Sequence, residues 1–171
     1  MINKYIAYNK MLKDFLKNFK EDRVETFTFV LLTIFTYGFY AVYWLGKLNK
    51  SFKGATKKYL VAENLIIVLG IFSFIELMFV NLAVGEALLG SEASWSTFTL
   101  MDNLSYIGTF GYLIMNIIIA FHVKTQITVV YISDKIKFEG NPILNFNSFF
   151  TFLFGAMYVC YKLNKILDFR K

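Results

Sequence analysis

A single carboxylate in the middle of an apolar stretch is the strongest chemical signal in this sequence. Glu76 lies well inside the apolar residues 59–84. If that stretch crosses a bilayer, a charge exposed to lipid there costs at least about 2.5 to 3.5 kcal/mol, so Glu76 has to face protein or water. Two interpretations stay open: a protonated acid that hydrogen-bonds across a helix pair, or a carboxylate on an ion path.

Small and polar side chains accompany Glu76 at helical spacing, and residues 103–123 carry a matching set. This polar stripe comprises Gly70, Ser73, Glu76, Leu77 and Asn81 on the first stretch and Ser105, Gly108, Thr109, Tyr112 and Asn116 on the second. If both stretches are helical and antiparallel, Glu76 lies near the depth of Thr109 and Tyr112. In a homo-oligomer with the stripe facing the axis, Glu76 would form a ring typical of cation-selective pores.

Glu63 and His122 form a second candidate pair, near the expected cytoplasmic ends of the same two stretches. At comparable depth the two side chains could meet, and a nearby carboxylate favours the charged form of a histidine. The pair is therefore a candidate gate that responds to pH. A structural ion pair at the membrane interface is the alternative.

No arrangement typical of an enzyme or of a metal site occurs in the sequence. Cys160 and His122 are the only cysteine and the only histidine, which excludes a disulfide framework and a thiolate metal cage. There is no phosphate-binding glycine loop, no paired histidine motif and no nucleophile elbow. We therefore expect a protein that is not an enzyme and that has no cofactor or metal.

The composition predicts which elements position these residues. Apolar residues make up 57% of the 171-residue chain, with 20 Phe and 11 Tyr, more apolar surface than a soluble core of this size can bury. Residues 59–84 and 103–123 are each long enough to cross a hydrocarbon core of about 30 Å. Residues 25–46 and 143–161 are apolar too, but polar residues interrupt them. We expect an all-α, polytopic membrane protein.

The basic residues predict how many of these four stretches cross. All eighteen Lys and Arg lie in residues 4–23, 47–58, 124–137 and 162–171, and none lies between the two clean stretches. Four spans would divide them ten against eight, and three spans would divide them twelve against six. Two spans place all eighteen on the cytoplasmic side. The marginal stretches would then re-enter, with Gly38 and Gly155 as bend points.

The two marginal stretches are copies of one repeat. Residues 35–50 and 150–165 are identical at nine of sixteen positions and share a final Lys-Leu-Asn-Lys. The basic cytoplasmic face comprises the lysines at the end of each copy and just after the first, namely Lys47, Lys50, Lys53, Lys57, Lys58, Lys162 and Lys165. Each copy therefore leads from an aromatic, apolar segment to a basic edge.

These features divide one membrane domain, residues 1–171, into successive parts. The first part, residues 1–24, is a basic amphipathic arm that suits either anionic headgroups or packing on the rest of the protein. The remaining parts are repeat copy one at 25–46, a transmembrane hairpin at 59–84 and 103–123, a cytoplasmic extension at 124–142, and repeat copy two at 143–165.

The first repeat copy also resembles a known family. Its segment reads Thr-x-Gly-Phe-Tyr-x-x-Tyr-Trp, carried by Thr36, Gly38, Phe39, Tyr40, Tyr43 and Trp44. This resembles the Thr-x-Gly-Ile-Tyr-x-x-Tyr-Trp segment of a widespread family of small bacterial membrane proteins of unknown function, over about residues 25–85. Phe39 departs from the usual aliphatic residue. The resemblance implies a bacterial inner-membrane protein and supplies no catalytic residues.

The sequence favours a homo-oligomeric, ion-permeable pore or a gated membrane-permeabilising protein, with both termini cytoplasmic. By analogy alone, such small proteins serve as effectors in bacterial antiviral defence, gated by an anionic cytosolic ligand. Anionic lipid is the expected partner of the basic face, and a nucleotide or nucleic acid is a further candidate. The alternative is a non-conducting scaffold or adaptor that recruits a cytosolic partner through the basic face. A substrate-binding transport subunit is a third option, although it would normally need more spans.

Overall fold

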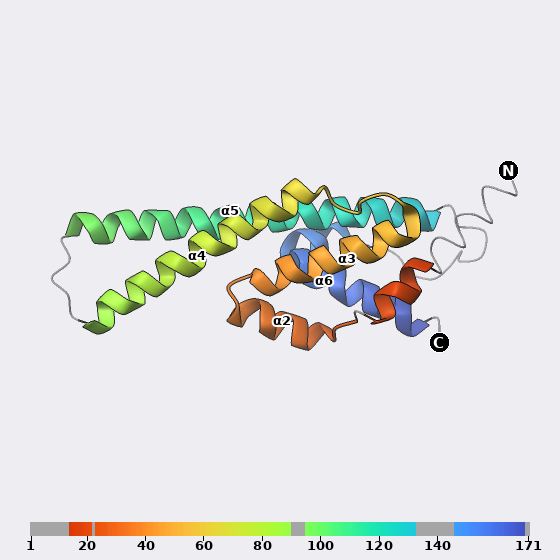
Figure 1. The fold of residues 1–171 in the computed structure, drawn as a ribbon, viewed down its shortest axis with the longest axis horizontal. Helices are drawn as coiled ribbons and strands as arrows, with labels where there is room; N and C mark the ends of the chain where they lie inside the picture. The colour runs from red at the N-terminus through yellow and green to blue at the C-terminus, as the bar shows by residue number, and fades with distance from the viewer. Residues whose placement is uncertain (1–13, 22, 90–94, 133–145, 170–171) are drawn as a thin grey trace, which may run out of the picture.

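The computed structural model describes residues 14–21, 23–89, 95–132 and 146–169, and all regular secondary structure in these residues is helical. A short helix at residues 14–21 precedes the five labelled helices in Figure 1. Their bounds are α2 Thr26–Phe35, α3 Phe39–Thr56, α4 Glu63–Leu89, α5 Trp95–Ile132 and α6 Ser148–Phe169. The predicted all-α class is confirmed for this part of the chain.

Helices α4 and α5 form a long antiparallel hairpin that projects beyond the other helices (Figure 1). Each contains a segment long and apolar enough to cross a membrane, Glu63–Val80 in α4 and Asn103–Ile127 in α5. Only 17% and 22% of these segments are buried by the rest of the chain, whereas the core helix of a soluble protein is mostly buried. Their large apolar side chains therefore face outward over most of their length.

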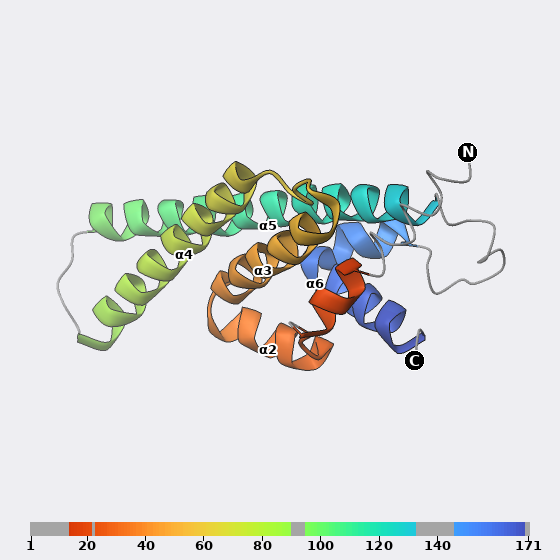
Figure 2. The same cartoon turned by 45° about the vertical axis from the view of Figure 1, so that its right-hand side comes forward.

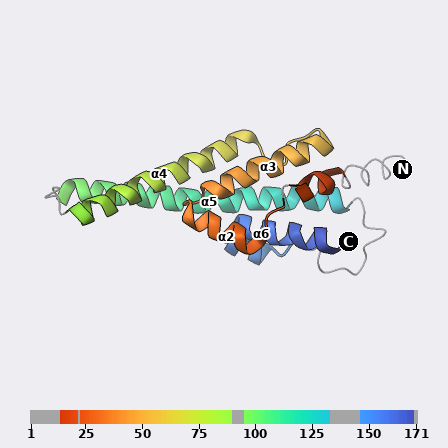
Figure 3. The ribbon, with the colours of Figure 1, turned by 60° about the horizontal axis from the view of Figure 1, so that its bottom comes forward.

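The remaining helices gather around the half of the hairpin that lies far from its tip (Figures 1 and 2). Helix α2 packs on α3 and α6, α3 packs on the beginning of α4, and α6 packs on α5. Figure 3 shows that α2, α3 and α6 all end well short of the hairpin tip. The two repeat copies thus lie beside only the half of the hairpin that is far from its tip.

The first repeat copy turns back on itself at Gly38, as predicted. Helix α2 ends in a Schellman motif, in which Gly38 N–H donates to the Thr33 carbonyl at 2.8 Å and Tyr37 N–H to the Ile34 carbonyl at 3.1 Å. Gly38 has φ +87°, the left-handed region that suits glycine. The Thr36 hydroxyl then accepts from Tyr40 N–H at 2.9 Å and so links the turn to α3.

The second repeat copy breaks at Gly155, also as predicted. Within α6, Gly155 has φ +50° and ψ −127°, which is not helical. Asn116 of α5 lies beside this break, where its Oδ1 accepts from the Ala156 N–H at 3.1 Å. A Cβ on Gly155 would lie 2.8 Å from the Asn116 side-chain nitrogen, so any larger residue would have to displace Asn116 in addition to adopting the positive φ. The two bends are not at equivalent repeat positions, since Gly38 aligns with Leu153.

The N-terminal arm packs on its own protein where it is described. Phe15, Leu16 and Phe19 are buried, and the rings of Phe15 and Phe19 contact Phe52 and Trp44 at centroid distances of 5.4 and 6.3 Å. The apolar face of residues 14–21 is therefore covered by α3, which favours intramolecular packing over the headgroup-binding alternative. Residues 1–13 of the predicted arm lie outside the described residues.

Helix α5 continues beyond the predicted span, to Ile132. The helix thus continues through residues 124–132 of the predicted extension at 124–142, whose remainder lies outside the described residues and whose cytoplasmic location stays a prediction. At 38 residues, α5 is about 57 Å long. It provides one continuous surface on which the hairpin partner α4 and the C-terminal helix α6 both pack.

Candidate functional site

Glu76 lies where the backbone of α4 approaches Gly108 of α5 closely. Its side chain is partly buried, and the Thr109 side chain of α5 hydrogen-bonds to it. A Cβ on Gly108 would lie 2.8 Å from the Glu76 backbone nitrogen, so the small residue permits this close crossing. Glu76 and Thr109 thus meet at the predicted depth, while the protonation state of Glu76 and the choice between the two interpretations stay predictions.

Other members of the polar stripe contact elements of the same chain. A Cβ on Gly38 would lie 2.4 Å from the Tyr112 ring, and Asn116 contacts the broken backbone at Gly155. Ser73 is fully buried and donates to the Leu69 carbonyl at 3.1 Å. The bends of both repeat copies therefore pack against the polar stripe of α5, at Tyr112 and Asn116, which lie about one helical turn apart. The Asn81 side chain lies outside the described residues, so its predicted place in the stripe stays a prediction.

Glu63 and His122 do not form the predicted contact. Both side chains are exposed, and the ion pairs of the described residues include none between them. Glu63 instead lies beside α3 at the beginning of α4. The candidate gate pair is thus absent from this conformation.

Asn49, which the sequence did not single out, holds the chain just before α4. It is 5% exposed, and its Oδ1 accepts from the backbone N–H groups of Leu60 and Val61 at 2.7 and 3.0 Å. Its Nδ2 donates to the Val61 carbonyl at 3.0 Å. One side chain thus satisfies three buried backbone groups where no helix can do so. Asn49 fixes the end of α3 to the start of α4.

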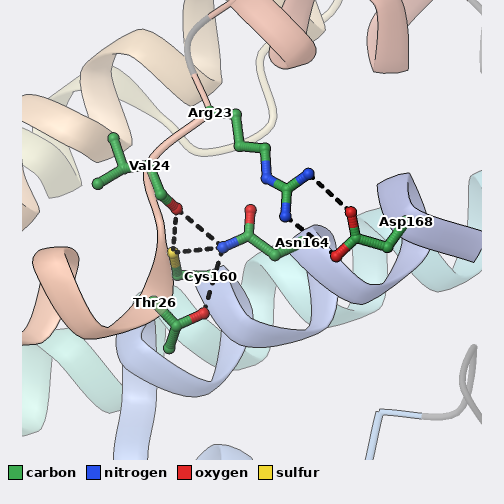
Figure 4. Close-up of polar contacts among 6 residues, drawn as sticks. All are labelled: Arg23, Val24, Thr26, Cys160, Asn164 and Asp168. Atoms are coloured by element: carbon green, nitrogen blue, oxygen red, sulfur yellow. Dashed lines mark hydrogen bonds and ion pairs between the residues drawn. The ribbon is translucent and has the colours of Figure 1, made fainter.

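Asn164, the equivalent residue of the second copy, holds the chain just before α2 (Figure 4). It is 6% exposed, and its Nδ2 donates to the Val24 carbonyl at 2.8 Å and to the Thr26 hydroxyl at 3.2 Å. Beside it, Arg23 forms a two-pronged ion pair with Asp168 at 2.7 and 3.0 Å. The shared Asn of Lys-Leu-Asn-Lys therefore has the same task in both copies, which is to bind the backbone that leads into another helix.

The basic face is exposed at most of the predicted lysines, with one correction. Lys50, Lys53, Lys57, Lys58 and Lys165 are exposed, and Lys47 is intermediate. Lys162 is only 8% exposed and its ammonium lies 5.7 Å from the centre of the Tyr158 ring, so it does not belong to an exposed face. The equivalent Lys47 lies 5.2 Å from the Tyr43 ring centre. The repeat thus conserves a lysine–tyrosine contact within the chain as well as an asparagine.

A groove of about 460 Å³ opens between α3 and the first turns of α4. Lysines line it on the α3 side, and a carboxylate and apolar side chains line it on the α4 side. The lining of the groove includes Lys50, Lys53, Tyr59, Glu63, Ile66 and Ile67. Lys53 also donates to the Tyr59 hydroxyl, which fixes one wall of the groove. Sequence spacing alone could not find this groove, since it depends on how α3 packs against α4.

Cys160 is buried behind Asn164 and should be chemically inert in the folded protein. Burial raises the pKa of its thiol from 9.0 to about 12, although a hydrogen bond with Thr26 and the charge of Arg23 act in the other direction. At pH 8 the thiolate fraction should thus be about 1,000-fold below that of a free thiol. We expect a maleimide or disulfide reagent to label the detergent-purified protein at least that much more slowly than the SDS-denatured chain.

The raised pKa of the Cys160 thiol also makes the stability of the folded protein depend on pH. Because the folded-state pKa lies above 9.0, the neutral thiol stabilises the folded protein fully below pH 9, and this contribution disappears as the pH rises from 9 to about 12.

A Tyr161→Cys variant in a Cys160→Ser background is the control for the labelling experiment, because Tyr161 is 37% exposed and the cysteine that replaces it should label rapidly. Equal labelling rates for the two positions would contradict the assigned burial.

In the part of the chain that the structure describes, the fold is all-helical, and two of its helices are long and apolar enough to cross a membrane. No protein-family model matches the chain, and no curated protein or solved structure matches it significantly. The resemblance of residues 25–85 to small bacterial membrane proteins therefore stays a prediction.

Proposed function

We propose that this chain is a non-conducting membrane adaptor, in which a two-span hairpin anchors two half-inserted repeats and a basic cytosolic face. The observation that carries the proposal is the common location of the lysine-bearing ends of the repeats. Helices α3 and α6 pack beside the same half of the α4–α5 hairpin, and their final turns carry exposed lysines (Figure 2). Such a face would concentrate anionic lipid and bind an anionic cytosolic ligand, a nucleotide or a nucleic acid among them.

The outward-facing apolar side chains support the membrane placement. In α4 and α5, exposed residues recur along the candidate spans, and in α2 and the first half of α6 they occur beside the bends. Examples are Ile67, Ile71 and Phe74 on α4, Phe110 and Ile114 on α5, Phe27 and Phe35 on α2, and Phe149 and Phe152 on α6. Apolar surface of this extent requires a lipid or protein partner. The positive-inside rule then favours a cytoplasmic location for the basic end, in a bacterial inner membrane by family resemblance.

The contacts of the polar stripe favour the adaptor over the pore. Tyr112 and Asn116 pack against the bends at Gly38 and Gly155, and Gly108 packs against the Glu76 backbone. Side chains that hold the protomer together in this way are not free to line a water-filled path. An adaptor requires no such path.

An oligomeric pore is the second candidate, and Glu76 is the observation that favours it. Its side chain lies inside a candidate span yet is only partly buried by its own chain. In lipid, a second copy of the protein or a column of water would have to cover the remainder. A gated pore would also retain the analogy with antiviral effectors that respond to an anionic ligand.

One reconstitution experiment separates the two candidates. In liposomes that contain anionic lipid, the adaptor should give an ion flux no higher than protein-free liposomes, and Glu76→Gln should leave it there. It should also retain a fluorescent single-stranded oligonucleotide at the surface, with weaker retention when Lys57 and Lys58 are both replaced by Gln.

Glu63→Gln is the matched control for Glu76→Gln, because it makes the same change at the exposed beginning of α4. A flux clearly above background that falls at least tenfold in Glu76→Gln, and not in Glu63→Gln, would replace the adaptor with the pore.

A further inference from the structure

The groove between α3 and α4 has a charge pattern that neither the basic face nor the hairpin explains. Lys50 and Lys53 lie on one side, and Glu63 lies on the other. Neither lysine forms an ion pair with Glu63, since Arg23 and Asp168 form the ion pair found in the described residues. Lys53 contacts Tyr59, and both Lys50 and Glu63 are exposed to the groove. Two positive charges and one negative charge thus stay available to a ligand.

The floor of the groove leads into an apolar track on α4. Ile66 and Ile67 line the groove one turn below Glu63. From there, exposed apolar side chains continue along one face of α4 at helical spacing, namely Ile67, Ile71, Phe74 and Met78, which are 46 to 63% exposed. The site therefore changes from charged to apolar in the direction that a phospholipid does, from headgroup to acyl chain.

We propose that this groove binds one glycerophospholipid with a primary-amine headgroup, such as phosphatidylethanolamine. Lys50 and Lys53 hold the phosphodiester, Glu63 accepts from the headgroup ammonium, and an acyl chain follows the track that begins at Ile67. A headgroup with a phosphate and an ammonium pairs all three charges of the groove. A headgroup without an ammonium, such as the glycerol of phosphatidylglycerol, leaves Glu63 without a cationic partner, and choline offers no N–H donor to a carboxylate.

This assignment rests on the proposed placement of the basic end at the membrane surface. It also goes beyond that placement, because a basic surface alone attracts anionic lipid without distinguishing among headgroups of equal charge. The groove predicts a preference for a zwitterionic lipid over both an anionic lipid and a second zwitterionic lipid. Electrostatic attraction to the lysines alone would instead favour the anionic lipid and would not distinguish the two zwitterionic lipids.

Lipid titration of the delipidated, detergent-purified chain tests the assignment, with bound lipid counted by native mass spectrometry. We expect phosphatidylethanolamine to bind about tenfold more tightly than phosphatidylglycerol or phosphatidylcholine. Lys50→Gln with Lys53→Gln should weaken its binding at least tenfold, since two charge-assisted contacts are lost. Glu63→Gln should remove the preference over phosphatidylcholine. Inorganic phosphate should not compete at millimolar concentration if the acyl track contributes.

The matched control is Lys57→Gln with Lys58→Gln, which removes the same charge from exposed lysines outside the groove lining. It should leave the phosphatidylethanolamine affinity within about twofold. Equal losses for the two double variants, or no preference for phosphatidylethanolamine in the wild type, would overturn the proposal. Competition by inorganic phosphate alone would identify a soluble phosphate site instead and would equally overturn it. Because the titration uses detergent and measures no flux, its outcome is separate from that of the adaptor test.

Discussion

Replacing Asn49 by alanine should lower the free energy of unfolding by about 3 kcal/mol or more. The substitution leaves the N–H groups of Leu60 and Val61 and the Val61 carbonyl without their partner, and both residues are at most 1% exposed. Each unsatisfied buried backbone group costs about 1 to 3 kcal/mol. Helix α4 would also lose the connection that sets where it begins relative to α3.

Denaturant titration in detergent micelles, with unfolding monitored by circular dichroism, measures this loss of stability. Asn103→Ala is the matched control, because Asn103 is an exposed helical residue of α5, and its replacement should change the free energy by less than about 0.5 kcal/mol. Asn164→Ala should fall between the two. It makes fewer contacts, and its own Oδ1 is a buried acceptor that has no partner among the described residues. If Asn49→Ala proved as stable as Asn103→Ala, the asparagine would not hold α4 as we describe.

Replacing Gly38 by alanine should cost about 2 to 5 kcal/mol. A non-glycine residue in the left-handed region costs about 1 to 2 kcal/mol, and Gly38 has φ +87°. The added methyl group would also lie 2.4 Å from the Tyr112 ring, an overlap that adds about 1 to 3 kcal/mol unless the ring moves. The same denaturant titration measures the sum.

A double variant separates the two causes. In a Tyr112→Ala background the overlap disappears, so Gly38→Ala should then cost only the backbone part, about 1 to 2 kcal/mol. Gly46→Ala is the control for the chemical change, because it lies in α3 with open space around its Cβ position. It should be neutral or slightly stabilising. A full-sized penalty for Gly38→Ala in both backgrounds would show that contact with Tyr112 contributes nothing.

Much of the architecture follows from local features of the sequence. Length and apolar composition predict the two helices of the hairpin, and Gly38 and Gly155 predict where the repeat copies bend. These predictions succeed because helix periodicity and glycine backbone freedom are properties of a few consecutive residues. The depth match between Glu76 and Thr109 also follows, since an antiparallel hairpin fixes it once the two helices are known.

The sites formed between distant elements do not follow from the sequence. The stripe residues Tyr112 and Asn116 are polar at helical spacing whether they face a pore or another helix of the same chain, so periodicity cannot distinguish the two. The role of Asn49 could not be predicted for a different reason. Its partners are backbone groups, which every residue has, so no side-chain pattern marks them. Its one sequence signal was identity with Asn164 in the two repeat copies, since a polar residue kept in both copies beside a buried leucine indicates a shared structural task.

The docking of Gly38 on Tyr112 has a consequence for how the protein is made. The two residues are 74 positions apart, so at about 5 to 20 residues per second the ribosome needs roughly 4 to 15 s to synthesise Tyr112 after Gly38. During that interval the α2–α3 hairpin exists without the surface that will receive its turn. Its Schellman motif and the contacts of Asn49 with Leu60 and Val61 are short-range, and they can form while synthesis continues. The nascent first copy therefore has to keep its bend by itself until α5 is synthesised, whereas the second copy finds Asn116 already in place.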